Sequence, residues 1–174
     1  HEFNRLESLA TNTTLKSLDL SRNRLSIPGY NFLMTVLNSN TTLTTLSLGE
    51  SVTRHLTHRD SIRFPTSFSF EIDHTLLPFK NITHLDLSGS NVLTMRNGST
   101  RSHIVDVISN PTLKSFKFNN IHPSLKEMTM ILKSLSKNKT MEIFEMAESI
   151  FDLKDLQIIF SENDTLRILD LGDN

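Results

Sequence analysis

Few side chains in this sequence are spaced so that they could perform chemistry. His55, His58 and Asp60 offer two imidazoles and a carboxylate, which bind zinc in some enzymes. Their spacing is loose, and neither a Cys nor a helical His-Glu-x-x-His pattern supports a metal site. No Gly-x-Ser-x-Gly turn positions a nucleophile, and no Gly-x-x-x-x-Gly-Lys loop binds phosphate. We therefore expect no catalytic residues, no native metal site and no cofactor.

The composition argues against several broad classes of protein. Among 174 residues, 18 Lys and Arg oppose 19 Asp and Glu, and this balance argues against a nucleic-acid binder. No apolar run approaches the roughly 18 residues of a transmembrane helix, so we expect no membrane span. The absence of Cys excludes a disulfide framework and favours a reducing compartment. With no catalytic group and no phosphate loop, we expect no small-molecule substrate.

A repeated apolar pattern, Leu-x-x-Leu-x-Leu, organises the chain. In five of its six copies an Asn stands three residues before the first apolar position, and a Thr stands directly before it. This shared register makes a chance origin untenable, and repeats of this length are typical of stacked structures. The copies are Leu15-Leu18-Leu20, Leu43-Leu46-Leu48, Ile82-Leu85-Leu87, Leu113-Phe116-Phe118, Met141-Phe144-Met146 and Leu166-Leu169-Leu171.

Each copy predicts one strand, one turn and one helix. The alternating part has the period of two that is typical of a half-buried strand, and the residues after the turn change to helical spacing. One unit cannot cover its own apolar face, so we expect the units to stack and to bury a continuous core. The expected helical faces are Leu33-Val36-Leu37, Ile72-Leu76, Ile104-Val107-Ile108, Ile131-Leu132-Leu135 and Leu156-Ile159-Phe160.

These residues resemble the leucine-rich repeat family, in particular its ribonuclease-inhibitor-like subclass, which has units of about 28–29 residues. The resemblance implies an α/β solenoid, or horseshoe, with parallel strands on the concave face and helices on the convex face. The clearest copy spans residues 12–40, from Asn12-Thr13-Thr14-Leu15 through Leu18, Leu20, Asn23 and Leu25 to Gly29, Leu33, Leu37 and Asn40.

The resemblance covers nearly the whole chain. We expect residues 1–174 to form a single leucine-rich repeat domain of about six repeats. The spacing of Phe3, Leu6 and Leu9 places the first residues inside a helix, and Asn174 follows a strand with no helix after it. Because the ends of solenoids normally carry polar caps, we interpret the domain as a fragment of a longer solenoid.

Some turns depart from the family pattern. The family places an Asn three residues after the last strand Leu, where its amide caps backbone groups. Asn23 and Asn174 fit this pattern, and the serines at positions 51, 90 and 149 can still form hydrogen bonds. Ile121 cannot, so we expect the fourth turn to be irregular.

The strand alternation predicts which residues face a partner. The candidate binding residues are acidic and basic side chains at outward positions of the strands or just beyond them. The exposed apolar residues Ile143 and Ile168 lie beside the last of them, which suggests an acidic docking patch with an apolar centre. The alternative is an ordinary solvated strand face. The candidates are Asp19, Asp86, Lys117, Glu145, Glu148 and Asp170.

The second unit is longer than the others by an insertion within residues 49–67. It contains Arg54, His55 and Arg59, and insertions in repeats often carry binding functions. We consider a basic loop that contacts a partner, and equally a tolerated insertion with no function, since extra loop length costs little.

Asn-x-Ser/Thr glycosylation sequons occur at six positions. Four of them coincide with the repeated Asn-x-Thr turn, so repetition of one structural motif produces them. We therefore give them little weight as a sign of secretion. They are Asn12, Asn40, Asn81, Asn97, Asn138 and Asn163.

These observations favour a non-catalytic module that binds a protein partner through its concave face and the insertion. The resemblance implies a cytoplasmic setting. The composition is also similar to that of Legionella-type leucine-rich repeat effectors, which would place the chain and its partner in the cytosol of a host cell. The alternatives are a glycosylated receptor or adhesion ectodomain and the substrate-selecting repeats of a larger enzyme.

Overall fold

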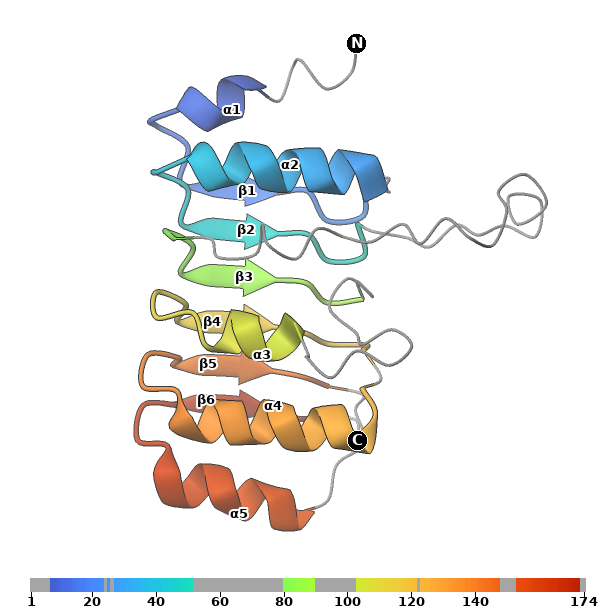
Figure 1. The fold of residues 1–174 in the computed structure, drawn as a ribbon, viewed down its shortest axis with the longest axis vertical. Coiled ribbons are helices and arrows are strands. Elements are labelled where there is room, and N and C mark those ends of the chain that lie inside the picture. The colour runs from blue at the N-terminus through green and yellow to red at the C-terminus, as the bar shows by residue number, and fades with distance from the viewer. Residues whose placement is uncertain are drawn as a thin grey trace, which may run out of the picture.

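The computed structural model describes residues 7–23, 25, 27–51, 80–89, 103–121, 123–147 and 153–172. Within them, six short strands form one parallel sheet whose spatial order follows the chain (Figure 1). The prediction of a mixed α/β fold with a parallel sheet is confirmed. The strands are β1 (Ser17–Asp19), β2 (Thr45–Ser47), β3 (His84–Asp86), β4 (Ser115–Lys117), β5 (Ile143–Glu145) and β6 (Ile168–Asp170).

The helices of the described residues form a layer in front of the sheet in Figure 1. Consecutive helices α3, α4 and α5 pack side by side, as do α1 and α2. The start of α4 is a capping box, in which Ser124 and Glu127 exchange side-chain and main-chain hydrogen bonds. The helices are α1 (Glu7–Thr11), α2 (Ile27–Ser39), α3 (His103–Ile108), α4 (Leu125–Lys137) and α5 (Leu153–Glu162).

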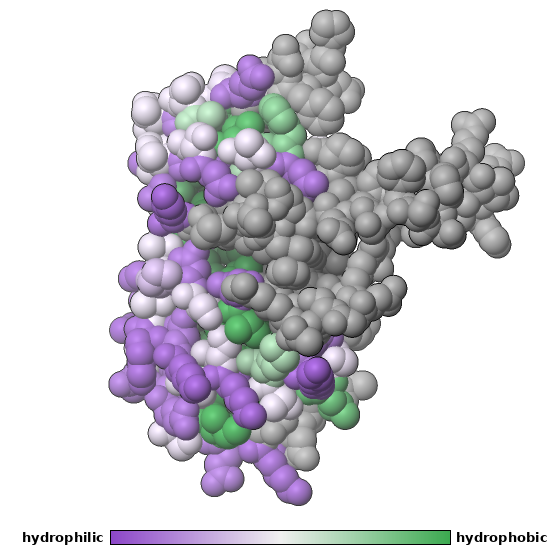
Figure 2. All heavy atoms as spheres, in the orientation of Figure 1, coloured by the Kyte–Doolittle hydropathy of each residue, from purple (hydrophilic) through white to green (hydrophobic). Residues whose placement is uncertain are grey.

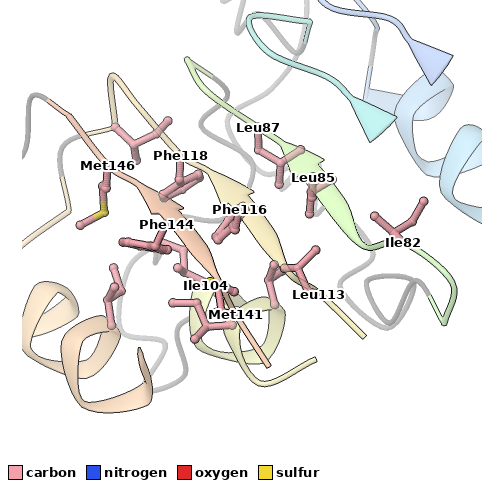
Figure 3. Packing of buried hydrophobic residues seen from close by; sticks show 14 of the residues in the cluster. Ile82, Leu85, Leu87, Ile104, Leu113, Phe116, Phe118, Met141, Phe144 and Met146 are labelled. Atoms are coloured by element: carbon pink, nitrogen blue, oxygen red, sulfur yellow. The ribbon is translucent and has the colours of Figure 1, made fainter. Parts of the chain in front are cut away.

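The core lies between these two layers. The middle residue of each strand points toward the helices, and at β3, β4 and β5 these side chains lie together with Ile104 of α3 (Figure 3). Phe116 contacts Phe118 and Phe144 through stacked and edge-on rings, with centroids 5.4 and 5.9 Å apart. The helical faces predicted for α2, α3 and α4 are buried, whereas Ile72 and Leu76 lie outside the described residues.

One residue predicted to lie in the core is exposed instead. Phe160 was expected to share the buried face of Leu156 and Ile159, but its side chain is 71% exposed. Successive residues are turned by about 100° around a helix, so Ile159 can face the core while its neighbour does not. Within the described residues no helix lies beyond α5 to cover Phe160.

The turns after the first four strands each have a left-handed residue at the same position. Arg22, Glu50, Gly89 and Asn120 occupy equivalent positions, and their φ angles lie between 53° and 68°. The expectation of an irregular fourth turn is nevertheless confirmed, because residues 21–22, 49–51 and 88–89 form hydrogen-bonded turns, whereas residues 119–121 form only a bend. Asn120 tolerates the left-handed conformation of this bend, and Ile121 is buried in the core.

An asparagine at the end of α2 ties its unit to the one before it. The Asn40 amide nitrogen donates hydrogen bonds to the main-chain oxygens of Leu9 and Asn12, at 2.7 and 3.1 Å. Its side-chain oxygen accepts hydrogen bonds from the N–H groups of Thr42 and Leu43, at 2.9 and 2.7 Å. One side chain therefore forms its own turn and also contacts the preceding unit.

The same arrangement recurs along the chain. Asn163 donates to the main-chain oxygens of Leu135 and Asn138, at 2.7 and 3.0 Å, and Asn138 donates to that of Ile108 at 2.6 Å. Asn81 stands two positions later in its unit, directly before Ile82, and donates to the main-chain oxygen of Asn40 at 3.2 Å. We call Asn40, Asn81, Asn138 and Asn163 the asparagine ladder. The ladder explains the repeated Asn, and the horseshoe curvature remains a prediction.

Replacement of a ladder residue tests this role. We expect Asn40→Ala to lower the free energy of unfolding by about 2–4 kcal/mol, because the N–H groups of Thr42 and Leu43 lose their acceptor and the bonds to the earlier unit are lost. Asn23→Ala is the control, since Asn23 is exposed and its amide donates to Ser21 in its own turn. Its effect should stay below about 0.5 kcal/mol. Urea unfolding followed by circular dichroism measures both, and equal small losses would contradict the role of the ladder.

Candidate functional site

Five of the predicted partner-binding residues lie in one row. Asp19, Asp86, Lys117, Glu145 and Asp170 are the last residues of β1, β3, β4, β5 and β6, and the strand register aligns them. Ser47 of β2 separates the first two. The residues point away from the core, onto the face of the sheet opposite the helices, which we call the open face. Neighbouring positions in the row are about 4.8 Å apart along the sheet.

The row contains an ion pair at its centre. The Lys117 ammonium lies 3.0 Å from a carboxylate oxygen of Glu145, and both side chains are partly exposed. A pair of this kind contributes up to about 1 kcal/mol to stability. It neutralises the centre of the row and leaves the carboxylates of Asp86 and Asp170 on either side of it.

The three aspartates of this row also have a structural role. One carboxylate oxygen of each accepts a hydrogen bond from the main-chain N–H two residues later, at 2.9 Å in all three cases. The acceptors are Asp19, Asp86 and Asp170, and the donors are Ser21, Ser88 and Gly172. This is the Asx-turn geometry that Asp favours. Turn formation is thus sufficient to explain Asp at these positions, whereas it does not explain Lys117 or Glu145.

A second charged row lies at the opposite ends of the strands, and sequence analysis missed it. It consists of the exposed Lys16, Lys114 and Arg167 with the half-buried Glu142. Glu142 pairs with Lys114 at 3.3 Å and with Arg167 at 4.0 Å. The signal was available, because each residue directly follows the first apolar position of its repeat. The charged residues directly before the strands are therefore mainly basic, and the last residues of the strands are mainly acidic.

Apolar side chains lie between the two charged rows at β5 and β6. Ile143 is half-buried and Ile168 is 49% exposed, and the strand register pairs them. The equivalent residues of β1 to β4 are Ser17, Thr45, His84 and Ser115. Among the described strands, the predicted apolar pair is thus confined to the last two.

The remaining predicted site residues lie outside the described residues. They are Glu148 and the three residues of the insertion, Arg54, His55 and Arg59. At the described start of the insertion, Glu50 forms an ion pair of 3.3 Å with Arg22 across the turns of the first two units. The possible metal ligands His55, His58 and Asp60 are also outside, and the described residues contain no cluster of three metal-ligating side chains.

The face of the molecule that the helices cover, which we call the helix side, differs from the open face in its surface character. Over α4 and α5 its visible surface is mostly hydrophilic, with smaller apolar areas between (Figure 2). Two large apolar side chains of these helices are exposed, Leu125 by 64% and Phe160 by 71%. No helix in the described part of the chain is long and apolar enough to cross a membrane.

The family model described as "Leucine Rich repeat" matches residues 11–29, which include β1 and the start of α2. This match supports a leucine-rich repeat family. It does not select the ribonuclease-inhibitor-like subclass or the Legionella-type effectors, and both remain predictions. The sequence matches no curated protein.

Two solved structures show a distant likeness to the chain. The tropomodulin C-terminal domain of Caenorhabditis elegans is 12% identical with a TM-score of 0.47, and the match covers 98% of this chain and 80% of that one. Actin-binding site 2 of leiomodin-1 is 14% identical with a TM-score of 0.48, and the match covers 98% and 76% of the two chains. Likenesses this distant assign neither a fold nor a partner to this chain.

The titration of Asp19 tests the turn geometry of the acidic row. Hydrogen bonds from the Ser21 hydroxyl and then from the Ser21 main-chain N–H hold the pKa of the Asp19 carboxyl below its ordinary value of 3.8. Since the folded pKa is lowered, the ionised carboxylate stabilises the fold above that ordinary value. This stabilisation is lost as the pH falls through the folded pKa.

We expect Ser21→Ala to raise the pKa of Asp19 toward 3.8, as measured by NMR titration of the carboxyl carbon. Ser109→Ala serves as the control, because this hydroxyl donates to Val105 on the helix side. An unchanged pKa of Asp19 in Ser21→Ala would show that the hydroxyl hydrogen bond does not form.

Proposed function

We propose that this chain is a non-catalytic module that binds a protein partner on the open face of its sheet, at β4, β5 and β6. The observation that carries the proposal is the exposed Ile168 beside Ile143, between charged rows of opposite sign. Apolar centres supply most of the affinity of protein interfaces, and charges around them set orientation and association rate. The open face at the last three strands combines both features.

The arrangement of charge defines the partner segment. The partner segment would carry an apolar side chain that contacts Ile143 and Ile168. It would carry basic groups near Asp170, where the strands end, and an acidic group near Arg167. Because Lys117 and Glu145 neutralise each other, the partner gains most from the carboxylate of Asp170. Contact with the Asp170 carboxylate would orient the partner segment along the strands.

The insertion and the cellular setting belong to the same proposal. Arg54, His55 and Arg59 would extend the contact beyond the sheet. We place the module in the cytoplasm, or in the host cytosol if the chain is a bacterial effector. Support for this setting comes from the lack of Cys and from the compositional resemblance.

The test compares two matched pairs of substitutions in affinity capture from eukaryotic cytosol. The open-face variant carries Ile143→Ser and Ile168→Ser. The helix-side variant carries Leu125→Ser and Phe160→Ser, which also remove two apolar side chains, both of them exposed. Circular dichroism and urea unfolding verify that both variants are folded. We expect the parent and the helix-side variant to capture the same protein, and the open-face variant to capture roughly tenfold less or lower still, as expected for loss of a central apolar contact.

Loss of capture by the helix-side variant alone would overturn the proposal and assign binding to α4 and α5. Salt provides a second readout, because contacts between charged rows weaken as ionic strength rises. Capture that is unaffected by salt would contradict the role of the charged rows, although not that of the isoleucines.

A further inference from the structure

Four of the glycosylation sequons coincide with the asparagine ladder. Asn40, Asn81, Asn138 and Asn163 each donate a hydrogen bond from the side-chain amide nitrogen to a main-chain oxygen of an earlier unit. The sequons at Asn12 and Asn97 are not part of the ladder. The same nitrogen that would receive an N-linked glycan is therefore the atom that joins neighbouring units.

Glycan attachment is chemically incompatible with these bonds. The transfer joins the Asn amide nitrogen to the anomeric carbon of the sugar, while the nitrogen loses a proton and the lipid pyrophosphate leaves. An unmodified amide nitrogen carries two hydrogens. At Asn40 and at Asn163 it contacts two main-chain oxygens, so a glycosylated nitrogen, which keeps one hydrogen, would lose at least one of these two hydrogen bonds to the earlier unit.

The limited space around these side chains also excludes a sugar. The Asn40 residue is 5% exposed and Asn138 is 9% exposed. Each side chain lies between successive units, whose strands are about 4.8 Å apart. A sugar at either nitrogen would have to separate the units and open the core between them.

We propose that the chain reaches its fold only when Asn40, Asn138 and Asn163 are unmodified, and that it therefore folds in a compartment without N-linked glycosylation. The inference is independent of the binding proposal, because it uses the turns between helices and strands and not the open face. It argues against the interpretation of the chain as a glycosylated ectodomain. The sequons at Asn12, Asn40, Asn138 and Asn163 are by-products of a structural Asn-x-Thr turn.

The test directs the full chain into the secretory pathway of eukaryotic cells by an added signal peptide, with and without an inhibitor of N-glycosylation. Folded chain is collected as the protease-resistant fraction, and mass spectrometry reports the glycan at each Asn. Because unfolded chain is the form that protease removes, we expect the yield of folded chain to be roughly tenfold lower in untreated cells. The protease-sensitive chain should carry glycans at the ladder.

Asp19→Asn supplies a matched control. It creates a new Asn-x-Ser sequon over positions 19–21, at an exposed position of the open face. In this variant, folded molecules from untreated cells should carry a glycan at position 19 and none at Asn40, Asn138 or Asn163. Folded molecules with a glycan at any of these three would overturn the proposal. So would an equal yield of folded chain with and without the inhibitor.

Discussion

The hydrogen bonds of the ladder asparagines are the interaction on which the rest of the structure depends. An Asn side chain is both an acceptor and a donor, and the fold uses the two ends differently. At Asn40 the oxygen closes the turn into β2, while the nitrogen holds the unit that carries β1. Asp could make only the first contact and Ser could not span both. Thr42 adds a hydrogen bond to the same Asn12 oxygen, at 2.9 Å, which explains the Thr that accompanies the Asn.

Ladder hydrogen bonds of the same kind attach the units of β2, β5 and β6 to the units before them, and the strands align in register, as do their outward residues. This alignment turns a periodic sequence into two charged rows with an apolar pair between them. The core does not constrain these outward positions, because the inward residues Leu85, Phe116 and Phe144 bury the apolar surface. The open face can therefore differ from strand to strand at little cost in stability, which is the property that a binding module needs.

Much of the fold followed from the sequence because the repeat presents the same local signal many times. The strands, the buried faces of α2 and α4 and the row from Asp19 to Asp170 could be located from periodicity alone. The sequence resemblance indicated a leucine-rich repeat family, and the family-model match to residues 11–29 supports that indication. The subclass and the curvature depend on small rotations between units that no local pattern encodes. Sequence patterns also mark Asn40 as a glycosylation site and Asp19 as a binding residue, although hydrogen bonds within the fold already account for both residue types.

The irregular fourth turn was predictable, because Ile121 cannot cap it and lies buried in the core. The failures have local physical causes. Phe160 follows helical spacing but lies where no described helix covers it. Tyr30 is buried with no hydrogen-bond partner for its hydroxyl among the described residues, and burial raises the pKa of that phenol. No prediction from the sequence covers this position, because periodicity does not detect one unsatisfied polar atom.

Hydrogen exchange of the Asn side-chain amides tests the central claim most directly. If the ladder joins the units, the side-chain hydrogens of Asn40, Asn138 and Asn163 exchange with solvent only when neighbouring units open. Their rates, measured by NMR, should then match those of the adjacent strand amides and fall orders of magnitude below the rate of the exposed Asn23. Exchange of the ladder amides as fast as that of Asn23 would contradict the account.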